Sequence, residues 1–195
     1  MIPPIVKNRN FIFLWWGHLI SHAGDAVYMI ALPWLMLELT GSNSLTSLVT
    51  ASAYLPSVLF GLIAGVIIDK YDRKRIMIIS DIARALLVTV IPIAIIFNFI
   101  TPLLIGCVTF LLSSFATFFY PARDSLIPHI TNPEELPSAN SAITISGQMA
   151  HLFGPLFAGI GISIFGLTHL FTADAVSFLF SILFIGLITK SIDQI

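Results

Sequence analysis

Three titratable side chains occur at helical spacing within an apolar stretch near the start of the chain. His18, His22 and Asp25 are four and three residues apart, so they share one face if the segment is helical. A carboxylate inside a bilayer is costly to insert and must face protein or water. Next to an imidazole, which titrates near neutral pH, it is suited to exchanging protons. We therefore expect Asp25 to take up and release a proton, with His22 as its neighbour.

The same three residues allow two other interpretations. Asp25 can make a purely structural hydrogen bond to another helix. Alternatively, His18, His22 and Asp25 can bind a metal ion together, although the sequence offers no further cluster of ligands. We expect no resident metal and no cofactor.

Other polar residues also interrupt apolar segments. Asp81 and Arg84 lie one helical turn apart and are predicted to form a structural ion pair, which Arg123 can join. Asp174 is expected at a membrane depth similar to that of Asp25. His151 must point at protein or water, so it is a candidate for lining a cavity.

The overall composition indicates whether water or lipid surrounds these residues. Of 195 residues, 57% are hydrophobic and only 10% are charged, with a mean hydropathy of +0.97. Soluble domains carry about 25% charged residues, and disordered chains are still more polar. Nine basic and ten acidic residues nearly cancel, so no nucleic-acid partner is expected. The partner that the composition predicts is the lipid bilayer.

Stretches without Asp, Glu, Lys or Arg locate the membrane spans. Residues 39–68, 85–122 and 136–173 contain none of these four residue types. A helix that crosses the hydrocarbon core needs about 20 residues. Turn-forming and charged clusters divide the chain further, with one break expected between Pro121 and Pro137. The sequence thus predicts an all-α polytopic membrane protein, a single bundle over 1–195 with six helices at about 11–37, 45–68, 76–98, 103–121, 139–165 and 168–189.

The positions of the basic residues predict how this bundle is oriented. With six spans, all nine Lys and Arg residues fall at or near one side of the membrane, and the opposite loops hold none. Positively charged loops lie on the cytoplasmic side. Both termini are therefore expected in the cytoplasm. The nine residues are Lys7, Arg9, Lys70, Arg73, Lys74, Arg75, Arg84, Arg123 and Lys190.

The segment between the second and third predicted helices carries the strongest motif. Residues 65–75 read GVIIDKYDRKR and resemble the G-x-x-x-D-[RK]-x-G-[RK]-[RK] signature of the major facilitator superfamily of transporters. Asp72 replaces the usual second glycine, as in the drug-efflux branch. Gly61 and Gly65 form a small-xxx-small pair suited to close helix packing. The resemblance implies that Asp69 braces a helix of the transporter's other half. The matching positions are Gly65, Asp69, Lys70, Arg73 and Lys74.

A second motif lies in the fifth predicted helix. Residues 147–159 read GQMAHLFGPLFAG and resemble the Gly-Pro motif of antiporters in the same superfamily. The matching positions are Gly147, Gly154, Pro155 and Gly159. Ala158 departs from the pattern, where a glycine is usual. This composition permits close packing and a bend at the proline, and the resemblance favours export over uptake.

Three further segments resemble a subgroup of the superfamily. Residues 120–128, residues 132–140, and 24–25 with 31–35 are similar to the macrolide-efflux and enterobactin-exporter group. The resemblance runs over residues 8–190 but covers only the N-terminal six-helix half of that fold. It implies a cell-membrane efflux permease that exports amphipathic small molecules, by proton antiport. It also implies a second six-helix half outside this sequence, in a downstream chain or as a homodimer.

This resemblance predicts a substrate cavity between two six-helix halves. By position, Tyr28, Met29, Tyr54 and Gln148 are expected to line it. A half-molecule or remnant that does not transport without a partner chain is the alternative. An intramembrane enzyme is the other class considered, but the chain lacks complete motifs for it: residues 144–147 lack the first glycine of a rhomboid-type G-x-S-G, and residues 81–84 lack the glycine of lipid phosphotransferases. The chain is predicted not to be an enzyme.

Overall fold

The computed structural model describes residues 4–189, which form α-helices and two short 3-10 turns. Six stretches are long and apolar enough to cross a membrane, as the sequence predicted. The elements are η1 (Pro4–Lys7), α1 (Arg9–Thr40), α2 (Asn43–Ser52), α3 (Leu55–Lys70), α4 (Arg73–Ile96), α5 (Pro102–Ile130), η2 (Pro133–Glu135), α6 (Leu136–Phe165) and α7 (Leu167–Gly186). Helices α2 and α3 together make the second span.

Local sequence signals start and stop these helices. The side chains of Asn8, Ser42, Asp72 and Thr101 each accept a backbone N–H of the following turn, which satisfies one of the donors left free at a helix start. Helix α1 ends at Gly41, whose φ of 61° is easily reached only without a side chain. The capping signals therefore agree with the charge-free stretches in dividing the chain into spans.

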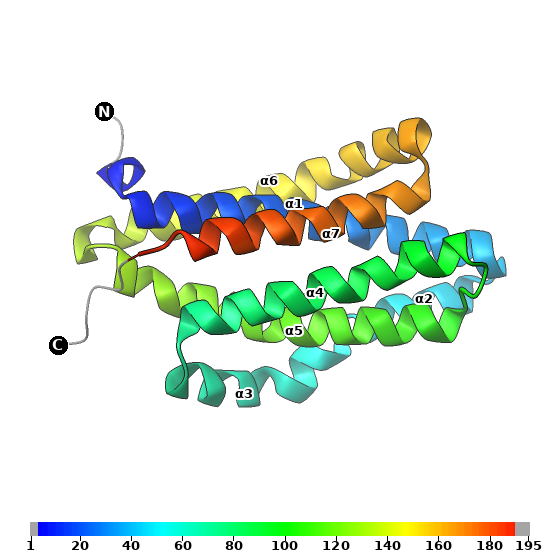
Figure 1. Cartoon of the computed structure of the whole chain (residues 1–195), viewed down its shortest axis with the longest axis horizontal. Coiled ribbons are helices and arrows are strands. Elements are labelled where there is room, and N and C mark those ends of the chain that lie inside the picture. The colour runs from blue at the N-terminus through cyan, green and yellow to red at the C-terminus, as the bar shows by residue number, and fades with distance from the viewer. Residues whose placement is uncertain (1–3, 190–195) are drawn as a thin grey trace.

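The helices run alongside one another, and their connections collect at two ends of the bundle (Figure 1). The start of α1, the α3–α4 and α5–α6 connections and the end of α7 lie at one end. The α1–α2, α4–α5 and α6–α7 connections lie at the other. Within the described chain, the basic residues outside the bundle interior gather at the first end, and residues 41–42, 97–101 and 166 contain no Lys or Arg. The charge asymmetry read from the sequence is thus also an asymmetry of the fold.

Helices α1, α4 and α7 form the centre of the bundle. Helix α1 packs along α7 and α6, and α4 packs against both α7 and α5, while α3 lies on α5. Two apolar clusters fill the space between them: one surrounds Leu32, Ile91 and Phe171 near the far end, and the other surrounds Leu14, Phe119 and Ile185 near the basic end. The polar residues described below lie between these clusters.

Two helix boundaries differ from the sequence prediction. The second span is not continuous, because a turn at Ala53–Tyr54 separates α2 from α3. Pro56 follows in the first turn of α3, and its missing N–H removes a helical hydrogen bond to the preceding turn. The predicted break from Pro121 to Pro137 is wrong in its first part, since α5 continues through Pro121 and Pro128 to Ile130. Prolines are tolerated inside membrane helices when neighbouring groups satisfy the freed carbonyls.

Candidate functional site

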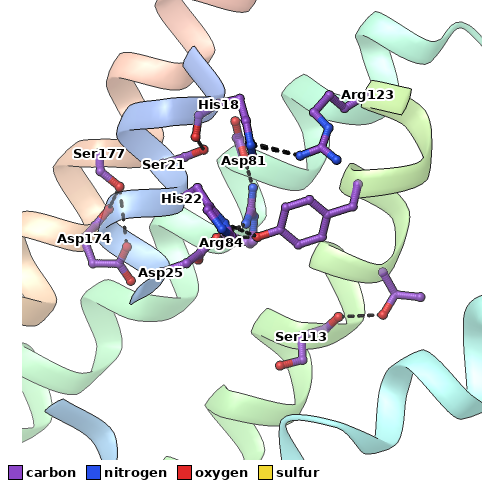
Figure 2. A network of polar contacts seen from close by, with 12 residues as sticks. His18, Ser21, His22, Asp25, Asp81, Arg84, Ser113, Arg123, Asp174 and Ser177 are labelled. Atoms are coloured by element: carbon purple, nitrogen blue, oxygen red, sulfur yellow. Dashed lines mark hydrogen bonds and ion pairs between the residues drawn. The ribbon is translucent and has the colours of Figure 1, made fainter. Parts of the chain in front are cut away.

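Asp25 of α1 lies at the centre of a polar network that joins three helices. Its Oδ2 accepts hydrogen bonds from Arg84 Nη1 of α4 at 3.1 Å and from Tyr120 Oη of α5 at 2.8 Å. The Arg84 side chain is 1% exposed and that of Asp25 is 26% exposed. Asp25 is thus ion-paired on its protein side and still open to a cavity on the other. Figure 2 shows the network from close by.

Arg84 is the only guanidinium of the network that is fully enclosed. It pairs with Asp81 one turn earlier, as the sequence predicted, and Asp81 is completely buried. The rings of Phe119 and Phe178 lie on the guanidinium, at 4.5 and 4.4 Å from centroid to Cζ. Cation–π contacts of this kind stabilise a desolvated arginine. One positive charge is therefore shared by two carboxylates, Asp25 and Asp81.

A series of hydrogen bonds connects His22, which stacks on His18, to Asp25. His22 Nδ1 lies 3.2 Å from Tyr120 Oη, which in turn donates to Asp25. His18 stacks on His22 with ring centroids 5.1 Å apart, and it accepts a hydrogen bond from Arg123 Nη1 at 3.0 Å. His22 is therefore linked to Asp25 through a tyrosine rather than directly.

The histidines do not gather metal ligands around them. Within residues 4–189, no group of three or more His, Cys, Asp or Glu side chains is arranged to hold a metal ion. His18 is turned toward Arg123, and His22 toward Tyr120. In the described part of the chain, His18, His22 and Asp25 thus do not converge on one point as ligands of a shared metal ion would.

A cavity of about 640 Å³ opens beside this network. Its polar wall contains His22, Asp25, Arg84, Tyr120 and Asp174, and the rest of the lining is mainly apolar or small. Its lining comes chiefly from α1 and α5, with smaller contributions from α3, α6 and the turn between α2 and α3. A volume of this size fits a drug-sized molecule, since ligand sites in proteins measure roughly 300–1,000 Å³.

Most residues expected at a cavity do line it. Tyr28, Met29, Tyr54 and His151 are in its wall, but Gln148 is not. Gln148 lies on the exposed surface of α6 instead. His151 also packs edge-on against His22, with ring centroids 5.3 Å apart. The apolar wall and the two imidazoles thus face the same space as Asp25.

The motif between α3 and α4 divides into residues with different contacts. Asp72, the departure from the usual glycine, caps α4 by accepting the Arg75 N–H at 2.7 Å. Lys74 Nζ donates to the carbonyl oxygens of Gly186 and Ile188 at 2.8 and 2.7 Å, which binds the start of α4 to the end of α7. Asp69 and Lys70 are exposed and form no ion pair with any described residue.

The motif glycines also fall into two classes. A Cβ at Gly154 would lie 2.8 Å from the Cβ of Ala26, so this glycine lets α6 approach α1 closely. Gly61, Gly65 and Gly159 have no neighbour within 4 Å of such an added atom. The close packing expected at Gly61 and Gly65 therefore does not occur within this chain. Gly147 lies near His22, and Pro155 lines the cavity.

Sequence reasoning missed Tyr120 and the true partner of Arg123. The sequence presents Tyr120 only as part of a subgroup motif, although its hydroxyl contacts both His22 and Asp25. Arg123 binds His18 and its neighbour Asp124 instead of joining Asp81 and Arg84. Tyr120 is 95 residues from Asp25 along the chain, and only the periodicity of α5 past Pro121 signals that Tyr120 and Arg123 lie on one helix.

Comparison with known proteins places this arrangement in a family. A family profile described as transmembrane secretion effector matches residues 3–193. The chain is 32% identical over 96% of its length to the uncharacterized MFS-type transporter YkuC of Bacillus subtilis, covering 42% of that protein.

Two further relatives are named for efflux. The multidrug efflux pump Tap of Mycolicibacterium fortuitum is 29% identical over 93% of the chain, and macrolide efflux protein A of Streptococcus pyogenes is 26% identical over 85%. The chain covers 46% and 41% of these proteins, so it spans less than half the length of the relatives it matches. They are transporters rather than enzymes. The chain belongs to the transmembrane secretion effector family of the major facilitator superfamily.

Proposed function

We propose that the chain forms the N-terminal six-helix half of an efflux permease that exports amphipathic small molecules across the cell membrane. The observation that carries this proposal is the cavity of about 640 Å³, whose wall is largely apolar but contains Asp25, Arg84, Tyr120 and two histidines. An apolar wall with a few charged groups suits a ligand that has one polar and one greasy part. The efflux functions named for Tap and macrolide efflux protein A are consistent with it.

The proposed coupling is proton antiport through Asp25. Protonation of Asp25 removes its charge and so weakens its pair with Arg84, which then remains bound to Asp81. The contact from His22 through Tyr120 offers a route for the proton between the cavity and the carboxylate. A change in one proton would thus alter how α1 is held to α4 and α5.

A second six-helix half supplies the other cavity wall in this proposal. The second and fifth spans are the least enclosed by the rest of the chain. Only 17% of the apolar membrane segment is buried in each of them, against 44% in α4 and in α7. Gly61, Gly65 and Gly159 lie on these two spans, and a Cβ added at any of them would meet no described atom within 4 Å. Small residues on a membrane helix surface favour close helix association. Exposed Asp69 would find its brace on the same partner, and both termini would lie in the cytoplasm.

Dye uptake into everted membrane vesicles tests the proposal, because the cytoplasmic face of such a vesicle points outward and an exporter then moves dye into the lumen. The vesicles carry the chain alone or together with a six-helix C-terminal half, and an uncoupler removes the proton gradient. We expect uncoupler-sensitive transport of an amphipathic dye only when both halves are present. Asp25→Asn should abolish it, whereas Glu134→Gln, which makes the same change at an exposed carboxyl, should not.

The alternative of a half-molecule that does not transport gives a different result in the same assay. In that case the two halves assemble, as shown by co-purification, but no uncoupler-sensitive efflux appears. Full efflux by Asp25→Asn would overturn the role of Asp25 while leaving export itself intact.

A further inference from the structure

Asp174 of α7 lies between two cavities. Its side chain is 2% exposed, yet it forms part of the wall of the central cavity beside Asp25. On the other side of α1, a second cavity of about 380 Å³ lies between α1, α6 and α7, and Asp174 lines this one as well. The other lining residues of the second cavity are nearly all apolar, including Val27, Met149, Phe153 and Phe157.

The contacts of the Asp174 carboxyl are few and uncharged. Ser177, one turn later, has its hydroxyl 3.5 Å from Oδ1 and donates to the Asp174 carbonyl oxygen at 2.8 Å. Gly24 of α1 packs directly on this pair, and a Cβ there would collide with both side chains. Among the described residues, no basic side chain forms an ion pair with Asp174.

The charged groups that face Asp174 leave no positive charge free for it. Asp25 faces it from α1, Asp81 and Arg84 face it from α4, and His151 of α6 shares the central cavity. Arg84 already pairs with both Asp25 and Asp81, so these three groups sum to one negative charge. An ionised Asp174 would add a second one in a desolvated site. A buried carboxylate without a partner is strongly disfavoured and takes up a proton instead.

We propose that Asp174 is a second proton-exchanging carboxyl of the central cavity, which holds its proton while Asp25 is paired with Arg84. In the release step the O–H bond of Asp174 breaks, the proton passes to a cavity water, and the carboxylate remains. In the uptake step the same bond forms again. This inference rests on the proposed proton antiport and adds a residue from a helix outside the polar network of Asp25.

Gly24 lets α1 pack closely against Asp174. A Cβ at position 24 would occupy the space of the Asp174 carboxyl and the Ser177 hydroxyl. Gly24 lines the second cavity and not the central one, so its role is to leave room beside α1 for the carboxyl of Asp174, which lines both cavities. Figure 2 shows Asp174 directed past α1 toward the side of Asp25.

Infrared difference spectroscopy of the full chain in liposomes tests this inference. A protonated carboxyl has a C=O stretching band that a carboxylate lacks, and the band shifts when the proton exchanges for a deuteron. We expect such a band at neutral pH that shifts within seconds of transfer to D2O. It should disappear in Asp174→Asn, move to a different frequency in Asp174→Glu, and persist in Glu134→Gln.

Three results would overturn the inference. They are the absence of the band in the unaltered chain, its survival in Asp174→Asn, and its failure to shift in D2O, which would identify a sealed structural carboxyl. Circular dichroism shows whether both Asp174 variants fold. If Asp174→Asn does not fold, the shift in band frequency in Asp174→Glu still tests the assignment. If uncoupler-sensitive efflux occurs but the band is absent, only the role of Asp174 is overturned. If the band is present but efflux does not occur, the proposed antiport is overturned, while the assignment of the protonated carboxyl to Asp174 stands.

Discussion

The interior of the bundle and its outward faces on α3 and α6 use polar and small residues differently. Inside, Arg84 binds Asp25 and Asp81 and is covered by two phenylalanine rings. Outside, the motif residues Asp69 and Gly65 have no ion pair and no close neighbour among the described residues. Asp69 and Gly65, two residues of the motif by which the family is recognised, thus contribute little to packing within this chain.

The difference indicates where each set of residues acts. A buried pair such as Arg84–Asp81 must be satisfied before the bundle can fold, because an unpaired charge in the interior is costly. An exposed glycine or carboxylate has no such constraint from its own bundle. Its identity is then explained by a surface that covers it, which is the second half in our proposal. The following substitutions separate interior roles from surface roles.

The largest effect is expected at Arg84. Arg84→Met leaves Asp81 buried with no positive partner and should lower the free energy of unfolding by about 3–5 kcal/mol. Denaturation in detergent, followed by circular dichroism, measures the change. The matched surface variant Arg75→Met should shift it by less than about 0.5 kcal/mol. Equal losses from the two variants would remove the distinction between interior and surface charges.

A smaller loss is expected where α6 meets α1. Gly154→Ala places a methyl group against Ala26 and should destabilise the chain by about 1–3 kcal/mol through overpacking. Gly159→Ala, five residues further along the same helix, meets open space and should not destabilise the chain, since alanine favours a helix over glycine by up to about 1 kcal/mol. Thermal unfolding of the two variants side by side gives the comparison. If Gly159→Ala instead weakens binding to a second half, Gly159 acts at the surface that contacts that half.

The hydroxyl of Tyr120 is expected to contribute about 1 kcal/mol. Tyr120→Phe keeps the ring but removes the donor to Asp25 and the contact to His22. Chemical denaturation measures the loss, and Tyr71→Phe serves as the control because Tyr71 is exposed at the end of α3. A loss no larger than that of the control would show that the hydroxyl does not support the network.

The smallest effect is expected within the α3–α4 motif itself. Lys74→Met removes two hydrogen bonds to the end of α7 and should cost about 0.5–1 kcal/mol. Lys70→Met removes an exposed charge and should be neutral in this chain. Hydrogen exchange of the last turn of α7 reports the difference. If protection is unchanged in Lys74→Met, the hydrogen bonds of Lys74 do not stabilise the end of α7, and Lys74 behaves like the exposed Lys70.

The spans could be predicted from sequence, but their internal detail could not. Stretches without charge locate six helices because lipid excludes unpaired charges from the core. The turn at Ala53–Tyr54 went undetected because its residues are as apolar as their neighbours. The sequence predicts a helix end at Pro121, although α5 accommodates this proline. In a membrane, proline and apolarity therefore give weaker boundary signals than charge does.

Only some contacts of the candidate site could be predicted from the sequence. Asp81 and Arg84 lie one turn apart, so their pairing follows from local geometry. The contacts of Asp25 with Arg84 and Tyr120 join positions 59 and 95 residues apart. Periodicity gives the face of a helix that carries such a residue but not the helix that it meets. Those contacts follow from the arrangement of α1, α4 and α5 in space, in which the long side chains of Arg84 and Tyr120 reach Asp25.

The turn between α2 and α3 forms part of the cavity wall. Ala53 and Tyr54 line the cavity, and Pro56 has no N–H with which to bind the carbonyl of the preceding turn. Pro56 therefore helps to keep α2 and α3 from joining into one continuous helix, although it is not itself among the lining residues. The shape of the cavity at this point thus depends on the course of the main chain as well as on the side chains that face the cavity.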